Sequence, residues 1–151
     1  MKVKAKILYL PNYDRSWGSM AYAHGTDSGF DARACMDTDL ELAPGERSAV
    51  PLGVKLQPAP GYGYQIRSRS GNARNLGLGM VNGVGTIDNG YRGELCALVI
   101  NLSDRPVKIE RGMKIAQIVV EPVYQFEFEE VLSEDAFEES QRGAGGFGST
   151  G

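Results

Sequence analysis

The chain has 151 residues and a mass of 16.3 kDa; 42% of the residues are hydrophobic and 23% are charged. This length and composition are typical of a single globular domain with its own core. The net charge of −3 gives no reason to expect nucleic-acid binding. The longest apolar run, residues 95–100, is far shorter than the roughly 20 residues of a membrane helix, so no membrane partner is expected.

The N-terminal residues, the two cysteines and the single histidine limit the compartment and the kinds of site that the chain can have. The first residues alternate between lysine and apolar side chains and lack the apolar block of a signal peptide, which predicts a cytoplasmic protein. Cys35 and Cys96 do not make a disulfide framework, and we expect both to be reduced and semi-buried. With His24 as the only histidine, a zinc site is not expected, and a divalent metal would be a hard ion bound by oxygen atoms.

Apolar and polar residues alternate with the period of a β-strand along most of the chain. This alternation predicts strands near residues 1–9, 39–42, 54–56, 62–66, 95–100, 107–109, 115–120 and 126–128. The 20 glycines, well above an average share, indicate tight turns between these short strands. No long amphipathic helix is expected, and residues 134–141 are predicted to form only one or two short turns. The sequence therefore predicts an all-β barrel or sandwich.

Charge is unevenly distributed along the chain. Residues 47–87 contain five basic residues and no acidic one, whereas residues 127–139 contain seven acidic residues and no basic one. Within the basic stretch, residues 67–71 combine guanidinium groups, hydroxyls and a glycine, a composition that suits an anion; a charged turn is the alternative. The acidic stretch is interpreted as solvated surface, with a partner-binding surface as the alternative.

The last ten residues contain five glycines, which predicts a flexible tail over residues 142–151 beside a β domain over residues 1–141. This tail carries a guanidinium, an aromatic ring and two hydroxyls, a set that can close over an anionic, planar ligand. Residues 143–148 also match G-x-G-x-x-G, but three further residues leave no room for the helix that a dinucleotide site requires.

Five segments occur in an order that resembles the dUTPase family, the deoxyuridine 5'-triphosphate nucleotidohydrolases of the trimeric all-β type. They are residues 28–34 (SGFDARA), 69–71 (RSG), 82–94 (NGVGTIDNGYRGE), 111–117 (RGMKIAQ) and the glycine-rich tail from 142. The resemblance implies a jelly-roll-like β-barrel and a homotrimer with active sites shared between subunits. It also implies hydrolysis of dUTP to dUMP and pyrophosphate with Mg²⁺, which limits uracil incorporation into DNA and supplies dUMP for dTMP synthesis.

The resemblance implies a catalytic role for Asp88, whose carboxylate would act as general base on the water that attacks the α-phosphate. By its spacing alone, Asp88 also fits a turn aspartate before Asn-Gly. The hairpin around it would bind the nucleoside through Asn82, Gly83, Val84, Thr86 and Ile87. Tyr91 would pack against the deoxyribose and exclude a ribose 2′-hydroxyl, and a core aromatic is its alternative interpretation.

The resemblance also implies the residues that hold the triphosphate. Arg69, Ser70 and Gly71 would bind the phosphates, and Gln117 would contact the α-phosphate or the attacking water. Asp31 would hold Mg²⁺ through water together with the substrate phosphates. In the tail, Arg142 would contact the γ-phosphate and Phe147 would stack on uracil, and the remaining contacts would come from Gly148, Ser149 and Thr150.

A few positions depart from the family pattern. They are Ala32, Asn72, Gly90, Ala144 and the polar segment 11–27. Two other functions were considered: a dCTP deaminase-like enzyme on the same fold, and a binding protein whose tail is ordered by a nucleotide to switch a regulatory protein partner. In the second case, residues 11–27 and 127–139 would be the partner surfaces.

Overall fold

The computed structural model describes residues 2–146. All strand pairings in this range are antiparallel. The strands are β1 (Ala5–Tyr9), β2 (Gly29–Arg33), β3 (Leu40–Leu42), β4 (Arg47–Pro51), β5 (Val54–Pro58), β6 (Tyr62–Ser68), β7 (Leu78–Met80), β8 (Gly85–Ile87), β9 (Cys96–Asn101), β10 (Val107–Ile109) and β11 (Lys114–Pro122). One helix, α1 (Ser70–Leu76), and two 3-10 turns, η1 (Arg15–Trp17) and η2 (Glu134–Ala136), complete the elements of these residues.

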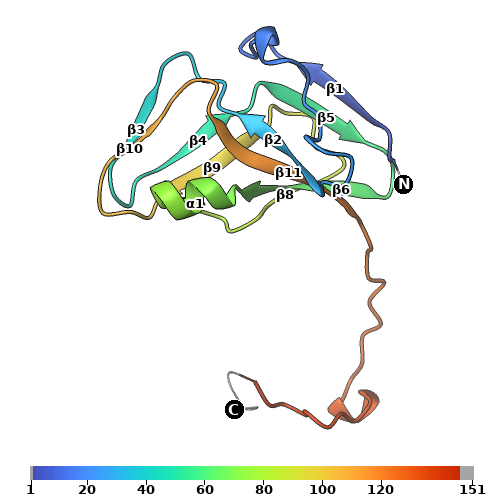
Figure 1. Ribbon diagram of the computed structural model, residues 1–151. Coiled ribbons are helices and arrows are strands. Elements are labelled where there is room, and N and C mark those ends of the chain that lie inside the picture. The colour runs from blue at the N-terminus through green and yellow to red at the C-terminus, as the bar shows by residue number, and fades with distance from the viewer. Residues whose placement is uncertain (1, 147–151) are drawn as a thin grey trace.

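The strands form four small sheets that enclose one core (Figure 1). The largest sheet has the order β2-β11-β6-β8, the second has the order β4-β9-β7, and β1-β5 and β3-β10 are two-stranded. The core between them is filled by branched aliphatic side chains such as Leu52, Ile66 and Ile118. The all-β fold class predicted from the alternation is therefore confirmed.

Three local predictions have clear outcomes. The predicted strand at residues 126–128 is wrong: this segment is extended but pairs with no strand of residues 2–146. The short turn predicted within residues 134–141 is confirmed by η2. Both cysteines are free thiols, as expected, and Cys96 is half-buried; Cys35, predicted to be semi-buried, is instead fully buried. No helix of the described part of the chain is both long and apolar enough to cross a membrane.

Helix α1 was missed because its sequence favours turns. It contains Gly71 and Asn72, both weak helix formers, and it ends at Gly77, which has a φ of 67°. Tertiary contacts hold it instead: the buried Asn72 donates through Nδ2 to the Lys114 carbonyl at 2.9 Å. The departure from the family pattern at Asn72 thus has a structural role, because it joins α1 to β11.

The segment between β1 and β2 packs on the turn that precedes β11. Tyr13 lies between Tyr9 and Trp17, with ring centroids 4.6 and 5.4 Å away. The Trp17 ring lies against Gly112, where an added Cβ would be 2.9 Å from Cζ2 of the ring. Asn12 and Trp17 of this segment therefore contact the turn at Arg111 and Gly112.

The chain leaves the β body after β11. From Val123 to Ala144 every residue is exposed, and the ribbon runs away from the sheets (Figure 1). Tyr124, Phe126 and Phe128, spaced two residues apart, are 90%, 86% and 89% exposed. We refer to residues 123–146 as the C-terminal arm.

Candidate active site

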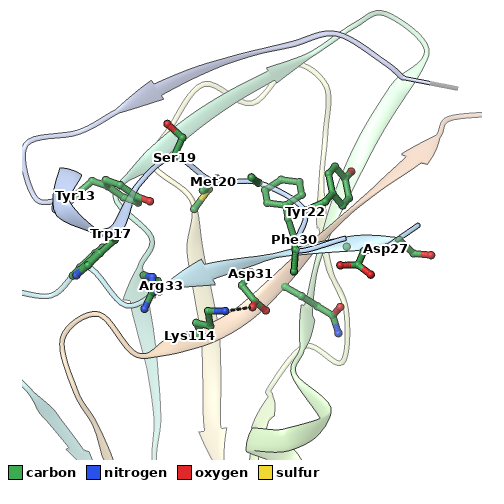
Figure 2. Close-up of a pocket in the computed structure, with 15 residues that line it drawn as sticks. Tyr13, Trp17, Ser19, Met20, Tyr22, Asp27, Phe30, Asp31, Arg33 and Lys114 are labelled. Atoms are coloured by element: carbon green, nitrogen blue, oxygen red, sulfur yellow. Dashed lines mark ion pairs between the residues drawn. The ribbon is translucent and has the colours of Figure 1, made fainter. Parts of the chain in front are cut away.

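A carboxylate held between two cations forms the first group of site residues. Asp31 lies on β2, Arg69 immediately before α1, and Lys114 at the start of β11. Arg69 Nε lies 2.8 Å from Asp31 Oδ1. On the other side, Lys114 Nζ lies 2.9 Å from Asp31 Oδ2, as Figure 2 shows. Partial burial raises the pKa of Asp31, but the Lys114 hydrogen bond and the Arg69 charge outweigh it and leave this pKa below its ordinary value.

Gln117 extends this group along the same sheet. It lies on β11 directly opposite Asp31 on β2. Its Nε2 donates to the Ser68 carbonyl at 2.9 Å, which fixes the amide plane. The side-chain oxygen Oε1 lies close to the backbone of residue 29. A Cβ added at Gly29 would be only 3.0 Å from this oxygen, so glycine at position 29 leaves room for the amide. An amide inside an apolar strand is thus explained by its direction, toward a cavity rather than the core.

Asp31, Lys114 and Gln117 line a cavity of about 570 Å³. Its other wall comes from the segment between β1 and β2 and from β2 itself, as Figure 2 shows. That wall includes Tyr13, Trp17, Met20, Tyr22 and Phe30. The cavity thus combines a charged wall that suits phosphate oxygens with an aromatic wall.

The residues of the predicted hairpin form a second group at a different cavity, of about 670 Å³. The hairpin itself is not formed among the described strands, because β8 pairs with β6 and β7 pairs with β9. We keep the name hairpin for residues 82–88. Thr86 and Ile87 of β8 and the following Asp88 line it together with Tyr62 and Tyr124. Asp88 is exposed, and its carbonyl accepts a hydrogen bond from the Tyr91 N–H at 3.0 Å. The turn predicted at this aspartate is present, and it leaves the carboxylate available for chemistry.

The other predicted nucleoside residues lie in turns on either side of β8. Asn82, Gly83 and Val84 form the exposed turn between β7 and β8, where Gly83 has a φ of 68°. Tyr91 is 45% exposed, and its hydroxyl donates to the Glu94 carbonyl at 3.0 Å. The alternative interpretation of Tyr91 as a core aromatic is therefore wrong.

The two groups do not meet within one chain. Across the sheet, Asp31 on β2 lies opposite Gln117 on β11, which lies opposite Arg67 on β6. Asp88 directly follows Ile87 on β8, and Ile87 lies opposite Tyr64 on β6. The offset is three strand spacings across the sheet and four residues along it. With about 4.8 Å per spacing and about 3.3 Å per residue, the two aspartates are about 20 Å apart.

The remaining predicted residues are only partly placed. Ser70 and Gly71 begin α1 and are exposed beside Arg69. Arg142 lies in the C-terminal arm, where its Nε donates to the Gly145 carbonyl at 2.7 Å. The ribbon of this arm runs away from the sheets that carry both groups (Figure 1). Phe147, Gly148, Ser149 and Thr150 lie outside the described residues.

Sequence reasoning missed Lys114. In a regular strand, residues three apart point to opposite faces, so Lys114 and Gln117 would not share a cavity. A β-bulge between Lys114 and Ala116 inserts one residue, and Ile115 and Ala116 are both buried as a result. The sequence holds two signals: Ile115 and Ala116 are adjacent apolar residues between polar ones, and Lys114 lies within the segment 111–117.

Comparisons with known proteins identify the family of the chain. The family model described as dUTPase matches residues 15–151. A deoxyuridine 5'-triphosphate nucleotidohydrolase of Roseobacter denitrificans is 45% identical over 150 residues, covering 99% of this chain and 97% of the relative. The homologue from Gloeothece citriformis is 46% identical and covers 86% of each chain.

Solved structures give the same answer for the fold. The dUTPase of Staphylococcus bacteriophage 80alpha with dUPNHPP superposes with a TM-score of 0.83 at 26% identity, covering 98% of both chains. The dUTPase of Streptococcus mutans superposes with a TM-score of 0.71 at 25% identity, covering 81% of this chain and 98% of that one. The chain belongs to the dUTPase family, the hydrolases that convert dUTP to dUMP.

Proposed function

We propose that the chain catalyses the Mg²⁺-assisted attack of water on the α-phosphate of dUTP, releasing dUMP and pyrophosphate. The observation that carries this proposal is the Asp31 carboxylate held between Arg69 and Lys114 beside Gln117. Lys114 and Gln117 face one cavity, and Arg69 is paired with Asp31 beside it, so two cations and an amide offer donors to a polyphosphate. In the cell, this reaction limits uracil incorporation into DNA and supplies dUMP for dTMP synthesis; the proposed compartment is the cytoplasm.

Asp88 is proposed as the general base. It is exposed on a cavity beside the hairpin, where a water can be aligned with the phosphorus atom. Its carboxylate accepts the proton of that water as the new P–O bond forms, and the bond to the pyrophosphate oxygen breaks on the opposite side. Gln117 would contact either the water or the α-phosphate.

Arg69, Ser70 and Gly71 are proposed to bind the phosphates of dUTP. Arg69 is fixed by Asp31 and by the Lys114 carbonyl, 3.2 Å from its Nη1, so its guanidinium is oriented before the substrate arrives. A side chain that is already oriented loses less rotational freedom on binding. Lys114 joins these residues as a further phosphate ligand.

The residues near Asp31 fit a magnesium ion held mainly by the substrate. No group of three or more metal-ligating side chains occurs within residues 2–146, so the protein alone does not build a cage. Both Asp31 oxygens already accept hydrogen bonds but retain lone pairs for a metal-bound water. When bound, Mg²⁺ would neutralise charge on the triphosphate, and Asp31 would orient the ion from outside its ligand shell.

The turns around β8 are proposed to recognise the nucleoside. Backbone groups between Asn82 and Ile87 would pair with the uracil edge, because a turn with a positive φ at Gly83 exposes peptide groups. Cytosine would leave these groups mismatched, and such a mismatch can reduce the rate about 10⁴-fold. The exposed Tyr91 ring would pack on the deoxyribose.

We infer that the active unit is a homotrimer with sites shared between copies. One chain keeps Asp88 about 20 Å from Asp31, which is too far for a single dUTP to use both. A second copy would bring its hairpin to the charged cavity of the first. The site is thus incomplete without a second copy.

Two surfaces of the chain support this assembly. The outer face of the β4-β9-β7 sheet is apolar: Leu98 is 38% exposed, and it lies between Ala49 on β4 and Val81 beyond β7. The C-terminal arm exposes Tyr124, Phe126 and Phe128, and the rings of Phe126 and Phe128 are neighbours, with centroids 5.9 Å apart. Exposed apolar groups that gather in this way often mark a surface covered by a partner.

The division of labour between residues 1–141 and 142–151 is part of the same proposal. The arm would carry Arg142 to the γ-phosphate and Phe147 to the uracil of a site on another copy, with Gly148, Ser149 and Thr150 alongside. The regulatory protein partner considered for residues 11–27 and 127–139 remains a prediction, because residues 11–27 pack on the body of the same chain.

A substrate panel tests the proposed reaction. Purified protein is incubated with dUTP, dTTP, dCTP and UTP, with and without Mg²⁺, and pyrophosphate and ammonia release are measured. We expect pyrophosphate release from dUTP alone, dependent on Mg²⁺. Ammonia release from dCTP would instead identify a deaminase, and no reaction with any of the four would overturn the proposal.

A further inference from the structure

The position of the Tyr91 ring depends on Gly93 and Glu94. The Tyr91 hydroxyl donates to the Glu94 carbonyl at 3.0 Å, so the ring lies back over Gly93. A Cβ added at Gly93 would lie 2.2 Å from the Tyr91 hydroxyl oxygen. The ring therefore has a defined seat, and that seat moves with the backbone of Glu94.

The Glu94 side chain anchors this seat to the body of the protein. Its Oε1 accepts hydrogen bonds from the Asn12 amide Nδ2 at 2.8 Å and from the Gly53 N–H at 3.0 Å. Hydrogen bonds to an ionised acceptor are stronger than those between neutral groups. Glu94 is half-buried, so these bonds are also partly shielded from water.

Asn12 is itself held from several directions. Its Nδ2 also lies 3.2 Å from the Cys35 carbonyl, and its own carbonyl accepts from Arg111 Nη2 at 2.9 Å. The turn that carries it is closed by the Tyr13 N–H donating to Leu10.

We propose that Asn12 is a positioning residue for sugar discrimination. Through Glu94 it fixes the Tyr91 ring at the place where the ring excludes a ribose 2′-hydroxyl. The proposal rests on the proposed role of Tyr91. The turn that carries Asp88, the proposed general base, is anchored separately. Asn89, next to Asp88, donates through Nδ2 to the Ala59 carbonyl at 2.9 Å and the Tyr62 carbonyl at 2.8 Å.

The test compares kcat and KM for dUTP and UTP in the full-length protein and in Asn12→Ala. Loss of the Asn12–Glu94 bond is expected to lower the dUTP/UTP ratio of kcat/KM about tenfold. The kcat for dUTP should stay near the wild-type value, because Asn89 still holds the turn beside Asp88. Gln57→Ala, which removes an exposed amide from β5, is the matched control.

A second pair of variants separates positioning from a general loss of structure. Asn12→Asp places two carboxylates next to each other and should lower the ratio further. Adding Glu94→Gln to that variant restores one hydrogen bond with donor and acceptor exchanged, and should recover part of the discrimination. The melting temperature and the oligomeric state of each variant are measured alongside, and the double variant carries the test if Asn12→Ala does not fold.

The outcomes distinguish this inference from the proposed function. A wild-type protein that does not hydrolyse dUTP overturns the proposed function and this inference with it. If the wild type prefers dUTP and every Asn12 variant keeps the same dUTP/UTP ratio, only the positioning role is lost. An equal fall of the ratio in Gln57→Ala would also overturn it, because the effect would then not depend on Glu94.

Discussion

The two groups of site residues are built in different ways. Asp31, Lys114 and Gln117 lie on the paired strands β2 and β11, and Arg69 lies immediately before α1. Their side chains contact one another or the neighbouring backbone. Asp88 and Tyr91 lie in a turn whose shape is set by neighbouring residues such as Asn89 and Glu94. The proposed phosphate side is therefore preorganised by charge, and the proposed nucleoside side by backbone anchoring.

This difference separates the expected effects of mutation. Loss of a side chain on the phosphate side leaves its charged neighbours unbalanced and should change both binding and local stability. Loss of the exposed Asp88 carboxylate should change chemistry alone. The predictions below test this separation.

The largest effect is expected for Asp88→Asn. The amide is close to the carboxylate in shape but accepts no proton from water, so kcat should fall about 10²–10⁴-fold. Binding of a non-hydrolysable dUTP analogue, measured by calorimetry, should remain within a few-fold of wild type. A kcat near the wild-type value would remove Asp88 as the base.

Mixed oligomers test whether the two groups of one site come from different copies. Asp88→Asn and Arg69→Ala are each expected to be nearly inactive. When the two are unfolded together and refolded in equal amounts, about a quarter of the sites should combine an intact hairpin with an intact phosphate group, giving about a quarter of wild-type activity. A mixture no more active than the separate variants would show that each chain completes its own site.

Deletion of residues 142–151 should lower kcat/KM at least about tenfold, because a charged contact to the γ-phosphate would be lost. The melting temperature and the trimer should be unchanged, since the strands end at Pro122. Size-exclusion chromatography and thermal unfolding are the controls. A trimer that dissociates on deletion would make the tail a structural element instead.

The extent to which the sequence predicted these features follows from the range of each interaction. Alternation along the chain predicted β1 and β11, because period two is a local property. Helix α1 was not predictable, since Asn72 is stabilised by a carbonyl 42 residues away. Lys114 was missed because a bulge changes the face on which it lies, and Asn12 because its partner Glu94 is 82 residues distant.

A pH series on Asp31→Asn tests the charge pairing of the phosphate side. The pKa of Asp31 is lower in the folded protein than its ordinary value, so the pairing stabilises the fold above about pH 4 and this contribution is lost as the pH falls through the folded pKa. At fixed protein concentration and pH 7, the wild type should unfold at a higher urea concentration than the variant. This difference between the two urea midpoints should become smaller below pH 4. Glu127→Gln, in the exposed arm, should show no gap at either pH.

The smallest effect concerns a thiol that neither group uses. Burial raises the pKa of Cys35 to about 11, and it also raises the pKa of the half-buried Cys96. Because the thiolate is the reactive form, iodoacetamide at pH 8 should leave Cys35 of the folded protein unmodified over hours, whereas both cysteines should react in denaturant. Mass spectrometry of the labelled peptides gives the readout. Gly53 packs closely on Cys35, because a Cβ added at Gly53 would lie 2.8 Å from Cys35 Sγ. Rapid labelling of Cys35 in the folded protein would mean that this packing is often broken and that the thiol is then exposed to solvent. In that case the anchoring of Glu94 by the Gly53 N–H would also be weaker than the static distances indicate.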